Sequence, residues 1–189
     1  MKKDLGVLPA IYPMPVLVIA AYDENGKPNA MNAAWGMQCD MDRVILFITE
    51  THKTTANIMV SKAFTVAIAD RAHMEVADFF GIATGNTMED KFARSGYHET
   101  KSKFVNAPVI EEFPLVMECE LSEVVKTDTL FAVVGKIMNV AAEESVLSEK
   151  GKVDPLKLNA LMYDVYDNGY YTTGEKAGLA WREGKRLMK

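Results

Sequence analysis

The chain has 189 residues, of which 49% are hydrophobic and 25% charged, the balance of a folded protein rather than a disordered one. Asp and Glu outnumber Lys and Arg by 26 to 21, and this acidic balance argues against a nucleic-acid-binding protein. No apolar run is long enough to span a membrane, and the opening MKKDLGVLPAIYP lacks the features of a secretion signal. We therefore expect one cytoplasmic domain over residues 1–189 that needs neither disulfides nor a structural metal to fold.

Extended segments dominate the N-terminal half. Two of them flank Asn25-Gly26, a pair that predicts a hairpin closed by a type I′ turn. The segment RVILFIT is apolar on both faces, which predicts a buried strand. The segment ETHKTTANIMVS then changes to a helical period, with Ala56, Met59 and Val60 on one face and threonines at its start. The strands expected in this half cover about 15–22, 28–37, 43–49 and 64–68.

The C-terminal half continues the same pattern after two helical stretches. HMEVADFFGIATG has an amphipathic helical period, and NTMEDKFARSG predicts one or two further helical turns. Strict alternation then predicts a strand with one exposed face, and a second long strand follows the turn at Thr127–Thr129. The strands expected here cover about 114–125, 130–142, 161–165 and 169–173. Many adjacent strands with few helices predict an antiparallel sheet that closes into a barrel.

Several familiar kinds of site are not supported by the sequence. It has no glycine-rich dinucleotide motif and no phosphate loop, and three isolated histidines make no metal site. Cys119 lies on the apolar face of its predicted strand, so we expect a buried structural residue. Cys39 also fits a structural role better than a catalytic one, although the sequence leaves its redox activity open.

The segment Asn29-Ala30-Met31-Asn32-Ala33-Ala34-Trp35 has few bulky side chains for a strand. Small residues allow a flat ligand to approach the backbone, and the asparagine amides can donate and accept hydrogen bonds beside it. A strand that packs closely against another element would have the same composition. Both interpretations remain open on composition alone.

The segment from Thr49 to Asn57 runs from a predicted strand into a predicted helix. A helix N-terminus presents free N–H groups to a phosphate, and Lys53 adds a positive charge beside several threonine hydroxyls. A threonine-rich cap with a solvated lysine is the alternative. The small-residue strand just upstream favours the phosphate interpretation.

The order of these motifs resembles the flavin reductase-like family of FMN-binding split barrels. The resemblance rests on PxPVLVIAA, NAMNAAW, HKTTANI, an F-x-V strand, Asp90-Lys91-Phe92 and a late G-x-Y-x-x-G-E. It covers about residues 9–184 and looks strongest to the flavoredoxin branch of the family. It implies a mainly β, antiparallel, Greek-key-like split β-barrel that forms a homodimer and holds FMN near the subunit interface.

The resemblance also implies which residues form the flavin site, carried over position by position. The isoalloxazine and ribityl chain would contact Asn29, Met31, Asn32, Ala33, Ala34 and Trp35. The phosphate would bind Lys53, Thr54 and Thr55, with Thr49 and Asn57 nearby. Lys91 and Tyr163 would complete the site, with Lys91 favouring the anionic reduced flavin, although an exposed lysine on a short helix would match the same sequence. Trp35 would either stack on the ring or fill the end of the barrel.

The resemblance implies an FMN-dependent oxidoreductase that takes a hydride or electrons from NAD(P)H or a redox protein and passes them to an acceptor. Two alternatives remain: an FMN electron carrier without turnover of NAD(P)H, and a barrel that binds flavin for sensing or storage. Leu130 stands where related sequences often have a histidine, which leaves the source of protons open.

Overall fold

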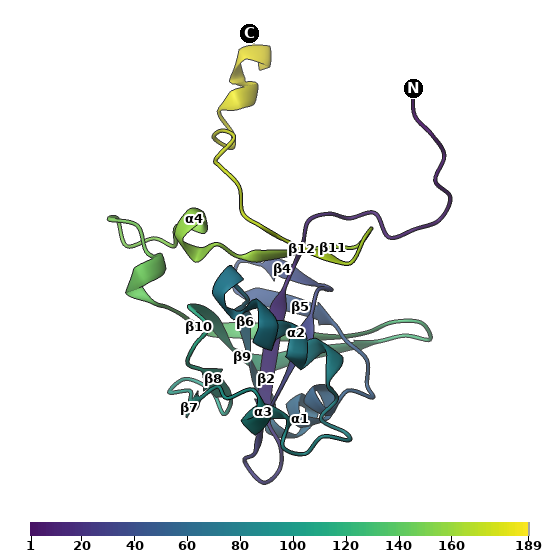
Figure 1. Cartoon of the computed structure of the whole chain (residues 1–189), viewed down its shortest axis with the longest axis vertical. Helices are drawn as coiled ribbons and strands as arrows, with labels where there is room; N and C mark the ends of the chain where they lie inside the picture. Colours follow the sequence, from purple (N-terminus) through teal and green to yellow (C-terminus); the bar gives the residue numbers. More distant parts are fainter. Residues whose placement is uncertain (189) are drawn as a thin grey trace.

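The computed structural model describes residues 1–188, and its main feature is a seven-stranded antiparallel sheet (Figure 1). The strands lie in the order β3-β2-β6-β9-β10-β5-β4, with β5 and β6 separated by the later hairpin β9–β10, as in a Greek-key-like barrel. Their bounds are β2 Leu17–Tyr22, β3 Pro28–Ala33, β4 Gly36–Asp40, β5 Arg43–Phe47, β6 Ala63–Ile68, β9 Leu115–Lys126 and β10 Phe131–Ala142. The predicted mainly antiparallel β-fold is confirmed.

The sheet curls because its two edge strands, β3 and β4, are consecutive in the chain. Only Ala34 and Trp35 lie between the end of β3 and the start of β4. The two edges therefore meet at this end although no ladder joins them, and the barrel stays split. The prediction of one strand over 28–37 is wrong. The chain leaves one edge of the sheet at Ala33 and joins the opposite edge at Gly36, where the Phe47 N–H donates to the Trp35 carbonyl at 2.8 Å.

The hairpin between β2 and β3 is confirmed, but its predicted turn type is wrong. Gly26 has a φ of +76°, and Asn25 is not among the residues with positive φ. The Gly26 N–H donates to the Asp23 carbonyl at 3.0 Å, and the Asp23 N–H donates to the Lys27 carbonyl at 3.0 Å. This is a three-residue loop with glycine in the left-handed position, rather than a two-residue type I′ turn.

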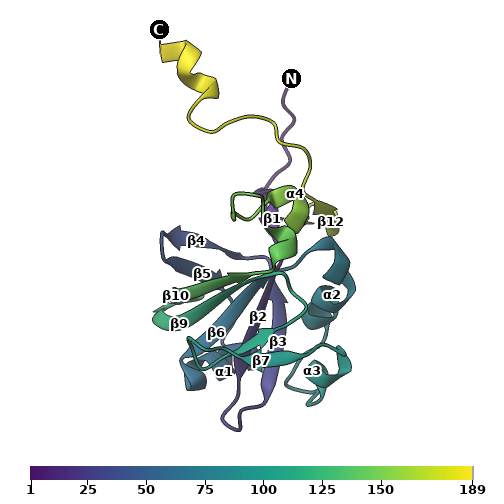
Figure 2. The ribbon, with the colours of Figure 1, turned by 90° about the vertical axis from the view of Figure 1, so that its left-hand side faces the viewer.

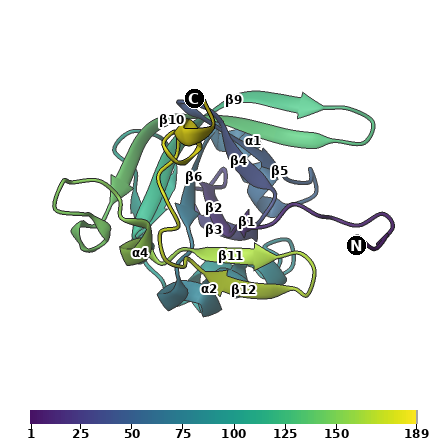
Figure 3. The same cartoon turned by 90° about the horizontal axis from the view of Figure 1, so that it is seen from above.

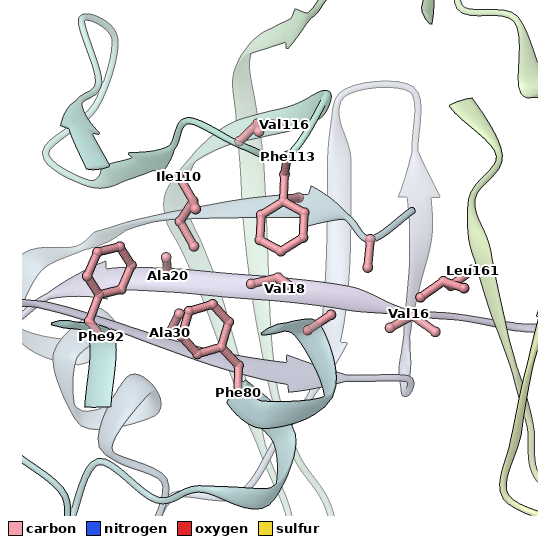
Figure 4. Packing of buried hydrophobic residues seen from close by; sticks show 13 residues of the cluster. Val16, Val18, Ala20, Ala30, Phe80, Phe92, Ile110, Phe113, Val116 and Leu161 are labelled. Atoms are coloured by element: carbon pink, nitrogen blue, oxygen red, sulfur yellow. The ribbon is translucent and has the colours of Figure 1, made fainter. Parts of the chain in front are cut away.

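Two hydrophobic layers form the core, one on each face of β2. Leu17, Ile19 and Ala21 point into the barrel, where they pack with Leu46, Phe64 and Val133, among others. Val18 and Ala20 point outward, against Phe80, Ile110 and Phe113 (Figure 4). A strand buried on both faces needs apolar residues at every position, which is what the sequence LVIAAY supplies.

The helices and short strands cover the outer layer and one end of the barrel. Helices α2 and α3 lie beside β2 and β3 in Figure 2, and their Phe80 and Phe92 rings stack with centroids 6.0 Å apart. Seen from above, strands β11 and β12 run across the top of the barrel next to α2 (Figure 3). The bounds are α1 Lys53–Ser61, α2 Met74–Ile82, α3 Lys91–Arg94, α4 Pro155–Leu158, β1 Met14–Pro15, β7 Glu99–Lys101, β8 Pro108–Ile110, β11 Leu161–Asp164 and β12 Gly169–Thr172, with short 3₁₀ turns at Arg71–His73, Glu144–Val146 and Glu183–Met188.

Helix α1 forms where expected, but the apolar residues that share one of its faces are not the buried ones. Ala56, Met59 and Val60 are exposed. The buried face instead consists of Thr54, Thr55, Asn57 and Ile58. Ile58 reaches the barrel core, and the Asn57 amide donates to the Ala21 carbonyl at 3.4 Å, so small polar groups face the sheet. None of the helices among residues 1–188 is long and apolar enough to cross a membrane.

Candidate cofactor-binding site

The split between β3 and β4 opens into a cavity of about 400 Å³. The end of β3 and the following connection form one wall of it with Met31, Asn32, Ala33, Ala34 and Trp35. This placement follows from the topology, because a chain that crosses between two sheet edges exposes its backbone and small side chains there. All five residues were predicted to contact the isoalloxazine or the ribityl chain.

Aromatic side chains form the opposite wall of the cavity. The ring centroids of Tyr163 from β11 and Tyr170 from β12 lie 6.4 Å apart, and the centroids of Tyr163 and Trp35 lie 6.3 Å apart. The Tyr170 hydroxyl donates to Asp78 Oδ1 at 2.8 Å, and burial together with Asp78 raises the pKa of Tyr170 to about 12. Tyr170 therefore stays a protonated donor at neutral pH and orients the carboxylate.

A second cavity, of about 440 Å³, lies toward the start of β3. Asn29 and Lys53 line it together with Gly85, whose close packing leaves no room for a side chain. A Cβ at Gly85 would lie 2.3 Å from Asn29 Oδ1 and 3.1 Å from Lys53 Cγ. Asn86 ties the same loop to the start of α1 by donating to the Thr51 carbonyl at 2.8 Å.

The N-terminus of α1 closes the gap between the two cavities with polar groups. Asn29 Nδ2 donates to Thr54 Oγ1 at 2.6 Å, which holds the helix against β3. Thr55 Oγ1 is buried and has no hydrogen-bond partner. The first turn contains no acidic residue, and its N–H groups have no partner within the helix. Lys53 Nζ lies 4.0 Å from Asp23 Oδ2, a distance that leaves the ammonium able to bind another anion.

Lys91 lies beside the site but is not among the residues that line either cavity. Only 3% of its surface is exposed, and its ammonium donates to the Phe80 carbonyl at 2.9 Å, at the C-terminal end of α2. The ammonium also lies 5.9 Å from the centroid of the Phe80 ring. Burial lowers the pKa of Lys91 to about 8. Its observed contacts are therefore those of a helix cap rather than those of an exposed lysine.

Four other predicted site residues also lie outside both cavities: Thr49, Thr54, Thr55 and Asn57. Thr49 is exposed, and its hydroxyl lies 3.1 Å from that of Thr51. Asn57 holds α1 against β2 through the bond described above. Leu130, the position where a histidine was expected from relatives, lines a separate cleft that shares Phe47 and Ile48 with the first cavity. Among residues 1–188, no group of three or more His, Cys, Asp or Glu side chains could hold a metal.

The first cavity also contains residues that the sequence interpretation missed. His52, Asp78, Gly81 and Tyr170 line it beside the predicted residues. His52 belongs to the HKTT motif, so its place next to the predicted residue Lys53 could have marked it as a site residue. Asp78 and Gly81 lie on a predicted amphipathic helix, and nothing in its periodicity marks them as site residues.

The two cysteines differ in their surroundings. Cys119 is fully buried in the barrel core, and burial with nearby Glu118 raises the pKa of its thiol to about 12, so the prediction of a structural residue is supported. Cys39 is exposed on β4.

Comparison with known proteins identifies the family. The family model of the flavin reductase like domain matches residues 10–174. Flavoredoxin of Desulfovibrio vulgaris is 32% identical and superposes with a TM-score of 0.92, covering 97% of this chain and all of that one. A flavoredoxin from Methanosarcina acetivorans is 28% identical with a TM-score of 0.88, covering this whole chain and 98% of that one. The predicted resemblance and the split-barrel fold are therefore confirmed.

More distant proteins share the fold or part of the sequence. An FMN-binding protein from Thermus thermophilus is 20% identical with a TM-score of 0.75, over 95% of this chain and 98% of that one. An uncharacterized protein of Aeropyrum pernix is 27% identical over 118 residues, which are 61% of this chain and 44% of the relative. The chain thus matches less than half of that relative's length.

Proposed function

Because this chain belongs to the flavin reductase like domain family, we propose that it is an FMN-binding oxidoreductase. It takes a hydride or electrons from NAD(P)H or a redox protein and passes them to an acceptor. One observation carries the proposal. A cavity at the split of the barrel lies beside a helix N-terminus that has free N–H groups, a lysine and no carboxylate in its first turn.

The residues present fit a flavin phosphate at the start of α1. Thr55 Oγ1 is a buried oxygen without a partner, a costly arrangement unless something binds there. Gly85 keeps the approach narrow, since a side chain at this position would displace Asn29. In this proposal Lys53, Thr54 and Thr55 hold the phosphate, and Asn29 orients the adjoining chain.

The other predicted residues would hold the ring. Ala33 and Ala34 leave the backbone accessible to a flat group, and Asn32, whose Nδ2 donates to the Ala77 carbonyl at 3.0 Å, presents its amide in a fixed orientation. Trp35 and Tyr163 restrict access from solvent. When bound, the flavin supplies the two-electron chemistry, so the protein's contribution is to bind, orient and tune it.

Anaerobic reduction tests the function directly. The purified protein should be yellow, or should become yellow when FMN is added. Mixing it with NADH or NADPH without oxygen should then bleach the flavin rapidly. A protein that stays colourless with FMN would contradict the flavin assignment.

Lys53→Ala tests the phosphate site separately. A charge-assisted hydrogen bond contributes about 1.5–3 kcal/mol, and because Lys53 is about one-third exposed we expect the lower end, roughly a tenfold loss of FMN affinity. Riboflavin lacks the phosphate, so its affinity should change little. Lys103→Ala, at an exposed position away from both cavities, is the control. Equal losses for FMN and riboflavin would refute a phosphate contact of Lys53.

The second candidate is an FMN electron carrier that receives electrons from a protein. It is favoured by the similarity to two flavoredoxins, which covers essentially the whole chain. Reduction by dithionite or a protein donor, without reduction by NADH or NADPH, would support the carrier.

We also propose that the protein is a homodimer. An apolar cleft of about 480 Å³ lies between the N-terminal segment and the connection from β3 to β4, and it shares Trp35 and Phe47 with the first cavity. Trp35 is 48% exposed and Met37 is 59% exposed, an unusual exposure for residues in one cleft. A second copy that covered this cleft would bury both side chains beside the flavin cavity.

A further inference from the structure

His52 differs from the other two histidines of the chain in having no partner. His73 pairs with Asp70, and His98 Nδ1 lies 2.9 Å from Glu112 Oε1. Among residues 1–188, by contrast, no hydrogen bond to the His52 ring is present. Its only bonds are from the backbone, where its N–H donates to the Thr49 carbonyl at 3.3 Å and its carbonyl accepts from Ala56 at 3.1 Å.

The position of His52 gives no structural reason for a histidine. It is the N-cap residue of α1, where Ser, Thr, Asp and Asn are preferred because their side chains accept bonds from the first turn. The His52 ring makes no such bond. A positive charge is also unfavourable at this end of a helix. His52 is exposed to solvent, and its ring forms part of the wall of the 400 Å³ cavity, where it is the only basic side chain.

Several charged or titratable groups from other elements surround His52. They are Lys91 on α3, Asp78 on α2, Tyr163 on β11 and Tyr170 on β12, with Lys53 following it on α1. Burial, and secondly the positive charge of Lys91, lower the pKa of His52 below its usual value. The Asp78 carboxylate accepts a hydrogen bond from Tyr170. A lowered pKa favours the neutral imidazole at neutral pH, even with the Asp78 carboxylate in the same cavity.

We propose that His52 binds a proton from solvent when a flavin in this cavity is reduced, so that its imidazolium balances the charge of the reduced ring. The inference rests on the proposed function, since it requires a flavin at this place. The reductant is a hydride donor or a one-electron donor acting twice. Two electrons and one proton enter the oxidised ring and leave it a monoanion, and a second proton passes from solvent to the free ring nitrogen of His52.

The physical reason is that a new negative charge favours a cation beside it. Lys91 is already bound to the Phe80 carbonyl and is buried away from the cavity lining. His52 is free to respond because no other group holds its ring. Its unperturbed range also lies near neutral pH, so a modest change of field changes its protonation.

The test is to titrate the histidines by NMR in three states of the wild-type protein. With ¹³C-labelled histidine, the chain has only three ring signals, and His52→Gln and His98→Gln assign two of them. Titrations are recorded without ligand, with oxidised FMN, and with FMN reduced anaerobically by dithionite. We expect the His52 titration to move to higher pH on reduction, while that of His98 stays unchanged. Riboflavin should produce the same movement, since the effect comes from the ring and not the phosphate.

The outcomes separate this inference from the proposed function. If FMN binds but the His52 titration is the same in the oxidised and reduced complexes, the inference is wrong and the proposed function stands. If neither FMN nor riboflavin binds, both are wrong. In addition, His52→Gln should lower the affinity for reduced relative to oxidised FMN by about tenfold, the equivalent of a one-unit shift in the pKa of His52. His98→Gln should leave this ratio unchanged, and an unchanged ratio in His52→Gln would also overturn the inference.

Discussion

Replacing Lys91 by Met should change how the stability of the flavin-free protein depends on pH. Lys91 is buried, and its ammonium donates a single hydrogen bond, to the Phe80 carbonyl at the end of α2. Met has a similar length and no charge, so it fills the same space without an ammonium to desolvate. The replacement removes both the charge and the helix cap.

The magnitude follows from the pKa of Lys91, which is lowered from 10.5 to about 8 by burial. One pKa unit corresponds to 1.36 kcal/mol, so the buried ammonium costs about 3 kcal/mol wherever both the folded and unfolded chains are protonated. Between about pH 8 and 10.5 the unfolded chain binds more protons than the folded one, so wild-type stability gains from rising pH. The loss of the bond to the buried carbonyl costs about 1–3 kcal/mol at any pH.

These terms predict different results at the two ends of the range. Near pH 7, Lys91→Met should be about as stable as the wild type, because the relieved charge offsets the lost cap. By pH 10 the wild type should be more stable than the variant by about 2–3 kcal/mol. Urea unfolding at pH 7, 8, 9 and 10 measures the difference, with Lys103→Met as an exposed control. A difference between Lys91→Met and wild type that does not change with pH would refute a buried charge at Lys91.

The remaining predictions concern the cofactor approach and the dimer. Gly85→Ala should weaken FMN binding about five- to tenfold, because the new Cβ would displace Asn29 and cost its hydrogen bond to Thr54. Calorimetry measures the affinity. The control Gly174→Ala, at a position with open space for a Cβ, should bind FMN as the wild type does. Affinity in Gly85→Ala equal to wild type would contradict the narrow approach. Met37→Asp should convert a dimer to a monomer in sedimentation experiments, whereas Leu156→Asp, at an exposed position on α4, should not. A Met37→Asp dimer would exclude this cleft as the interface.

Local sequence patterns predicted most strands because alternation and two-sided burial are local properties. The long strands β9 and β10 and the strand β5 formed close to the predicted positions, although β5 is fully buried only on the face of Val44 and Leu46 and leaves Phe47 exposed. The prediction of one strand over 28–37 failed because a continuous strand and a strand broken at Ala34 have similar local preferences. Nothing within residues 28–37 indicates that the chain changes sheet edges at Ala34, because that break is set by closure of the whole barrel.

The helical period of α1 did not identify its buried face, for a related reason. Periodicity placed Ala56, Met59 and Val60 on one helical face, and the structure leaves that apolar face exposed. The barrel end accepts Thr54, Thr55 and Asn57 because Asn29 and the Ala21 carbonyl supply partners for them. Such partners lie far away in the sequence and do not affect its local pattern.

The sequence by itself determined the strands, the family and the two motifs that line the cavities. It did so because strand alternation is local and because NAMNAAW followed by HKTT is distinctive. Only the tertiary structure decided that Lys91 caps α2, that Asp78 and Tyr170 face the cavity, and that His52 stands there without a partner. The physical reason is that burial, charge and hydrogen bonding depend on which distant segments meet, and the curl of the sheet decides that.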